Sequence, residues 1–133
     1  MHRYVKEQGS KLLRRLIFRL HRAATSRDPE AIHDLRVAIR RFQQFLRVFE
    51  QFLPRAKVKK IRPQLRAILK LSGEVRNRDI ASALLKKNGG SNDSPLSMTL
   101  ARQRRQAQSE LLQLIARLHT RDVARKWHSK LRF

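Results

Sequence analysis

The sequence contains no cysteine, so it has neither a disulfide framework nor a thiolate metal site, and we expect a reducing, cytoplasmic location. Acidic residues are scarce: 10 Asp and Glu stand against 32 Lys and Arg, a formal net charge of +22. No apolar run approaches the ~18 residues that a membrane-spanning helix needs. These absences exclude a disulfide-stabilised secreted fold and a membrane span.

The basic charge gives the first functional prediction. Most Lys and Arg side chains have no acid left to pair with, and such a charge destabilises a compact chain until counterions or a polyanion neutralise it. The basic residues alternate with Leu, Ile, Val and Phe at helical intervals, which a disordered basic tail would lack. We therefore expect a folded domain that binds a polyanion.

Helical periodicity runs through the chain, and no stretch alternates with the period of a β-strand. The expected helices occupy residues 3–24, 29–52, 55–87 and 96–133, with a flexible loop at 88–95. Amphipathic helices joined by short turns predict an all-α fold, an antiparallel four-helix bundle with long, partly kinked helices. At 133 residues the chain fits a single domain.

Several residues predict where helices begin, bend or end. Asp28 and Ser94 are predicted N-caps, and each is followed by a proline, which suits the first turn of a helix. Pro63 is expected to break or kink the third helix, because proline lacks the backbone N–H and disfavours helical geometry in the preceding residue. Gly73 indicates a second bend or a close approach, and residues 120–122 are expected to interrupt the fourth helix.

The second helix separates an apolar face from a basic strip. Its apolar face consists of Leu35, Ile39, Phe42, Leu46, Phe49 and Leu53. On a wheel of about 100° per residue, four basic residues fall within about 60° of one another, well away from that face. These are His33, Arg36, Arg40 and Arg47. No acid lies inside the strip, although acids three or four residues from each arginine would stabilise an ordinary exposed helix.

Two other helices carry similar basic rows. The first helix has Lys11, Arg15, Arg19 and Arg22, and the third has Arg62, Arg66 and Lys70. If the helices pack side by side, the three rows can line one groove, where guanidinium and ammonium groups match phosphate oxygens. For a single row, an ordinary solvated face is the alternative. His33 also has two interpretations: it lies beside a bound phosphate, or it pairs with Glu30 or Asp34.

Two segments resemble one protein family. Residues 31–42, Ala-Ile-His-Asp-Leu-Arg-Val-Ala-Ile-Arg-Arg-Phe, resemble the signature of the CHAD domain, the conserved histidine α-helical domain. That signature has a His, an Arg three positions on, and paired Arg four and five further. Residues 71–80, Leu-Ser-Gly-Glu-Val-Arg-Asn-Arg-Asp-Ile, are similar to the family's Leu-Gly-x-x-Arg-Asp-x-Asp-Val segment. With the basic first helix, the resemblance covers about residues 1–87.

The resemblance implies a helical domain that binds inorganic polyphosphate in a basic channel and often targets proteins to polyphosphate granules. It makes His33, Arg36 and Arg40 channel residues, and Arg76 matches the second motif. Arg41 matches too, but it lies off the strip and is expected to pair with an acid; Asp79 is expected to organise an arginine. The predicted binding residues are Lys11, Arg15, Arg19, Arg22, His33, Arg36, Arg40, Arg47, Arg62, Arg66, Lys70 and Arg76.

The chain also departs from the family pattern. Asn77 replaces an expected Asp, and Ser72 replaces an apolar residue. Family members commonly have two pseudo-symmetric bundles, whereas this chain has room for one. Either one bundle suffices, or two copies associate as a homodimer with twofold symmetry, which we favour.

Other functional classes fit the sequence less well. It shows no nucleophile–base order, phosphate-binding glycine loop or unpaired carboxylates, and no His spacing typical of metal sites, so we predict no catalysis, metal or cofactor. Binding to RNA or DNA is the main alternative, because arginine-rich helices bind any phosphate chain. Against it, the phenylalanines of the second helix lie on its buried side and cannot stack on bases. Attachment to a membrane surface by the first helix is a third possibility.

Overall fold

The computed structural model describes the backbone of residues 1–133 and the side chains of residues 1–119 and 122–133. Every regular element in this part of the chain is helical, which confirms the all-α class. The elements are α1 (His2–Thr25), α2 (Pro29–Val48), η1 (Glu50–Phe52), α3 (Arg55–Lys87), α4 (Pro95–Leu118) and α5 (Thr120–Lys130). Among the described residues, no helix combines the length and apolarity that crossing a membrane requires.

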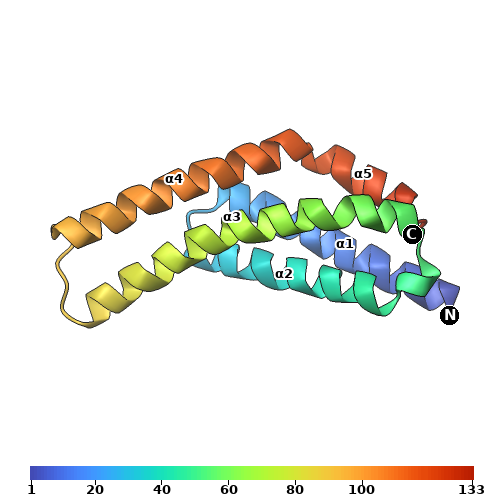
Figure 1. Ribbon diagram of the computed structural model, residues 1–133, viewed down its shortest axis with the longest axis horizontal. Helices are drawn as coiled ribbons and strands as arrows, with labels where there is room; N and C mark the ends of the chain where they lie inside the picture. Colours follow the sequence, from blue (N-terminus) through green and yellow to red (C-terminus); the bar gives the residue numbers. More distant parts are fainter.

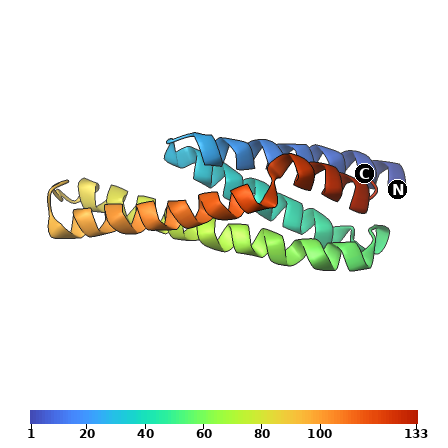
Figure 2. The same cartoon turned by 90° about the horizontal axis from the view of Figure 1, so that it is seen from above.

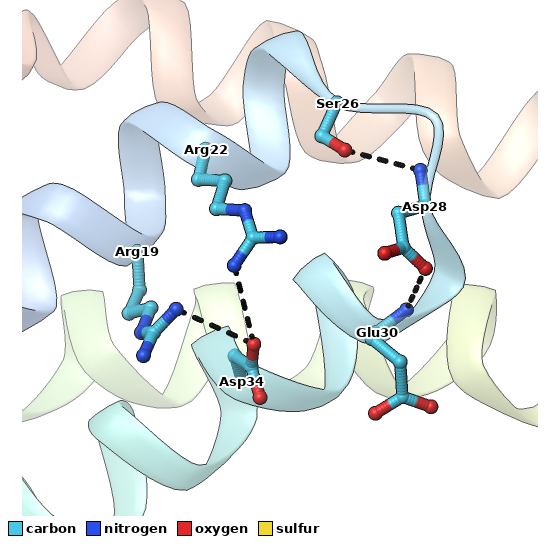
Figure 3. A network of polar contacts seen from close by, with 6 residues as sticks. All are labelled: Arg19, Arg22, Ser26, Asp28, Glu30 and Asp34. Atoms are coloured by element: carbon cyan, nitrogen blue, oxygen red, sulfur yellow. Dashed lines mark hydrogen bonds and ion pairs between the residues drawn. The ribbon is translucent and has the colours of Figure 1, made fainter.

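The predicted caps are confirmed. Figure 3 shows the turn between α1 and α2, where the backbone N–H of Glu30 donates to the Asp28 carboxylate at 3.0 Å. The backbone N–H of Asp28 in turn donates to the Ser26 hydroxyl at 3.1 Å. At the start of α4, the N–H of Ser97 donates to the Ser94 hydroxyl at 3.1 Å. Each contact satisfies a backbone group that a helix end leaves without a partner.

Three helix boundaries differ from the sequence prediction. The second helix is α-helical only to Val48, and its expected last turn is the 3-10 helix η1.

Pro63 does not break α3, which continues through it. A proline removes one helical hydrogen bond, but here its neighbours Ile61 and Leu65 are buried, and that packing keeps the segment helical. The expected interruption near residues 120–122 occurs at His119, whose φ of 49° is left-handed.

Figure 1 shows that consecutive helices from α1 to α4 reverse direction, and that both termini lie at one end of the molecule. α2 packs against α1 and α3, α3 packs against α4, and α5 returns along α1. The C-terminal end of α3 and the N-terminal part of α4 extend beyond the turn between α1 and α2 (Figures 1 and 2). We call this protruding part, residues 80–103, the distal hairpin.

The core confirms the apolar face predicted for α2. Leu35, Ile39 and Leu46 are completely buried, and so is Phe42. The ring of Phe42 is nearly parallel to that of Trp127 in α5, with centroids 6.2 Å apart. α5 packs along α1 and brings this indole onto α2, so the last helix completes the core around the inner face of α2.

Candidate anion-binding groove

A cavity of about 340 Å³ opens between α2 and α3. Four arginines and two glutamines line it, and no acid does. The lining residues are Arg40, Gln43, Gln44, Arg47, Arg62 and Arg66. We call it the α2–α3 groove. Its cations come from the predicted strip on α2 and the predicted row on α3, so the structure brings these two sets together.

Arg36 joins the two helices beside this groove. Its Nη1 donates to the backbone carbonyl of Leu69 at 2.5 Å and to the hydroxyl of Ser72 at 3.1 Å, both on α3. The Ser72 hydroxyl also donates to the Leu69 carbonyl at 3.0 Å. Ser72 is completely buried, and these bonds satisfy its hydroxyl. The serine that departs from the family pattern therefore holds the arginine of the first motif.

Gly73 allows this contact. A Cβ on residue 73 would lie 2.7 Å from Nη1 of Arg36, closer than side-chain carbons normally come to such an atom. The glycine in the middle of α3 is therefore a place of close approach, one of the two roles predicted for it. The helix accepts a residue with low helix propensity because a guanidinium group crosses its surface there.

Replacing this glycine gives a direct test. Gly73→Ala should displace Arg36 and lower the free energy of unfolding by about 0.5–2 kcal/mol, since lost hydrogen bonds to a charged group outweigh the better helix propensity of alanine. Urea denaturation measures the change. In an Arg36→Ala background the same substitution should stabilise the protein by up to about 1 kcal/mol. Equal destabilisation in both backgrounds would show that the contact with Arg36 is not the cause.

The charges around Arg36 are not balanced. Burial lowers the pKa of Arg36, and the positive charges of Arg40 and Arg76 lower it further. An arginine still remains protonated at neutral pH, so three positive charges stay close together. An anion placed among them would relieve their repulsion.

Arg62 differs from the other three arginines of the groove. Its Nη2 is buried and forms an ion pair with the Glu50 carboxylate at 3.9 Å, without a hydrogen bond. Among the described side chains, Arg40, Arg47 and Arg66 have no acid within 4.0 Å. The positive charge left unpaired in the groove is therefore that of these three arginines.

The α1 row lies elsewhere. Arg19 and Arg22 each reach the same carboxylate oxygen of Asp34, at 3.3 and 3.6 Å, as Figure 3 shows. Asp34 precedes Arg36 by two positions, so it lies about 160° around α2 from it. Lys11 and Arg15 on α1 are exposed. The expected groove shared by three helices is therefore not formed, and only the α2 and α3 rows meet.

Other predicted residues surround the groove without lining it. His33 and Lys70 are exposed, and Arg76 is half-buried near Arg36. Neither Glu30 nor Asp34 forms an ion pair with His33 among the described side chains, where Asp34 pairs instead with the arginines of α1. Arg41 is exposed, and the part of the chain with described side chains offers it no acid within 4.0 Å.

Asp79 binds an arginine, the kind of contact predicted for it. Its Oδ1 accepts a hydrogen bond from Nε of Arg104 in α4 at 2.5 Å, and Arg104 also donates to Gln108 at 2.7 Å. This ion pair joins α3 to α4 at the base of the distal hairpin. Neither Arg104 nor the groove residue Gln43 belongs to a basic strip or motif that the sequence predicts. Among the described residues, no group of three His, Asp or Glu side chains lies close enough together to hold a metal ion.

The family model of the CHAD domain matches residues 8–132 of the 133-residue chain. The chain belongs to the CHAD domain family. No curated protein and no solved structure matches it. In this CHAD domain the two motif segments meet, because Arg36 of the first binds Ser72 of the second and passes over Gly73. Of the two motif segments, the first contributes Arg40 to the lining of the α2–α3 groove.

Proposed function

We propose that this CHAD domain is a non-catalytic module that binds inorganic polyphosphate in the α2–α3 groove. The observation that carries the proposal is a cavity lined by no acid and by four arginines, one of which, Arg40, also repels the neighbouring guanidinium group of Arg36. Successive phosphates of a linear chain would accept hydrogen bonds from successive arginines. The phosphate chain would at the same time release its bound counterions, which favours binding.

The structural unit behind this groove is inferred to be an antiparallel four-helix bundle, in which α4 and α5 together form the fourth member. A non-catalytic role is supported by the lining of the groove, which contains no carboxylate that could act as a general base. Asp34 and Asp79, the aspartates of the two motif segments, are both held by arginines. The proposed location is the cytoplasm, at polyphosphate granules. The homodimer stays a prediction.

Nucleic acid is the alternative ligand, since it presents the same phosphate charges. Sequence-tolerant binding of single strands uses aromatic side chains on which bases stack. Phe42 and Phe45 are buried in this protein, and the exposed aromatic rings Tyr4 and Phe18 lie on α1, outside the groove. The groove therefore offers charge and hydrogen bonds without stacking surfaces, which favours a ligand without bases.

Competition binding distinguishes these ligands. In the assay, the protein holds a labelled polyphosphate, and one unlabelled competitor is added at a time. The competitors are polyphosphate, single-stranded RNA, duplex DNA and anionic vesicles, compared at equal charge concentration and equal salt. We expect unlabelled polyphosphate to compete best and log K to fall linearly with log salt concentration. If duplex DNA or RNA competes better at equal charge, the proposed ligand is wrong.

A further inference from the structure

A second cavity, of about 540 Å³, adjoins the α2–α3 groove, and the side chain of Arg47 lines both. It lies along the segment that runs from the end of α2 through η1 to the start of α3, so we call it the η1 cavity. Its lining residues are Arg47, Val48, Glu50, Gln51, Leu53 and Arg55. The η1 cavity therefore adds one arginine to those of the groove, and, unlike the groove, it contains an acid.

That acid, Glu50, connects the two cavities. Its carboxylate lies 3.9 Å from Nη2 of Arg62, so the ion pair joins the lining of the η1 cavity to the lining of the groove. Among the described side chains, Glu50 is the only acid within 4.0 Å of an arginine that lines the groove. The one carboxylate that reaches these arginines therefore stands at the end of the groove that faces Arg55.

The pair between Glu50 and Arg62 is weak. No hydrogen bond accompanies it, and the two side chains are 47% and 36% exposed. An ion pair of this kind contributes little to stability, because water screens it and both side chains lose freedom in forming it. An anion that does form hydrogen bonds with the guanidinium group can therefore replace the carboxylate.

We propose that Glu50 is an internal competitor of the ligand: it holds Arg62 in the free protein, and a phosphate chain displaces it in order to run from the α2–α3 groove into the η1 cavity. This inference rests on the proposed polyphosphate function. Carboxylate and phosphate both bind guanidinium groups as anionic acceptors, so the two compete for Arg62. A carboxylate that stayed in place would also repel each phosphate that passes it. Arg55, which is exposed and has no acid within 4.0 Å among the described side chains, is the next cation beyond it.

The position of Glu50 makes its effect depend on the length of the ligand. A short anion such as pyrophosphate can bind among the three groove arginines that no described acid approaches, Arg40, Arg47 and Arg66. A long chain extends beyond them and meets the carboxylate. Glu50 should therefore weaken the binding of long chains more than that of short ones.

Calorimetric titration of a Glu50→Gln variant tests this role. The substitution keeps the shape of the side chain and removes its charge. At low salt the affinity for long-chain polyphosphate should rise about three- to tenfold, whereas the affinity for pyrophosphate should change less than about twofold. The matched control Glu110→Gln removes the same charge from an exposed site on α4, outside both cavities, and should bind both ligands like the wild type. Circular dichroism should show equal helicity in all three proteins.

A double-mutant cycle shows whether Glu50 acts through Arg62. In an Arg62→Gln background, the gain from Glu50→Gln should shrink to about half or less, because the ion pair no longer exists. An unchanged affinity of Glu50→Gln for long chains, an equal gain for pyrophosphate or with Glu110→Gln, or an undiminished gain in the Arg62→Gln background would overturn the inference. In each of these cases polyphosphate still binds, and the proposed function stands. Failure of both wild type and Glu50→Gln to bind polyphosphate would contradict the proposed function, and this inference with it.

Discussion

Replacing Arg40 and Arg66 together by alanine should weaken polyphosphate binding by about a hundredfold or more. Both line the α2–α3 groove, from opposite helices, and both are exposed. A charge-assisted hydrogen bond contributes about 1.5–3 kcal/mol, and each 1.4 kcal/mol is a factor of ten in affinity. Isothermal titration over a series of salt concentrations measures the loss. The slope of log K against log salt should also become shallower by about one per phosphate contact removed.

The matched control removes the same charge at a distance. Arg3 and Arg125 are 92% and 83% exposed and lie outside the groove. Where side chains are described, each pairs with one acid on its own helix. Their double alanine variant should bind polyphosphate within a few-fold of wild type. If both double variants lose affinity equally, net charge alone drives binding and the groove has no special role. The stability of the Arg40→Ala, Arg66→Ala protein should be unchanged, because neither side chain is buried.

Phe42→Ala should lower the free energy of unfolding by about 3–5 kcal/mol. The ring is completely buried, and it stacks on Trp127, which holds α5 against the rest of the core. Removing it leaves a cavity and frees the last helix on one side. Chemical denaturation followed by circular dichroism and by Trp127 fluorescence measures both effects.

The control for this substitution lies on the same helix. Val48 at the end of α2 is 55% exposed, so Val48→Ala should change stability by less than about 0.5 kcal/mol. A small effect of Phe42→Ala, comparable to that of Val48→Ala, would mean that the inner face of α2 is assigned incorrectly. Binding of polyphosphate by the folded fraction of either variant should match wild type.

The local features of this fold could be predicted from the sequence because they depend on nearby residues. The caps at Asp28 and Ser94 and the buried positions Leu35 and Ile39 follow from spacing along one helix. The effect of Pro63 could not be predicted in this way. Whether a helix ends at a proline depends on the packing of its neighbours, which the local sequence does not contain.

The candidate site was predictable only in part, for a similar reason. Periodicity places Arg36 and Arg40 on one side of α2, but it does not say which neighbouring helix that side faces. The row on α1 was therefore expected in the same groove, whereas Arg19 binds Asp34 on the other flank of α2. Arg104 lies 25 positions from Asp79, across a loop, and no local pattern connects the two.

The contact between Arg36 and α3 has a consequence for which residue can occupy this position. The two hydrogen bonds to α3 both use Nη1, so the N–H groups of Nε and Nη2 are not needed for this contact. A lysine has a single nitrogen and could not make the same contact while keeping a second nitrogen in reserve. One guanidinium group can therefore hold α2 against α3 and still have donors left for another acceptor.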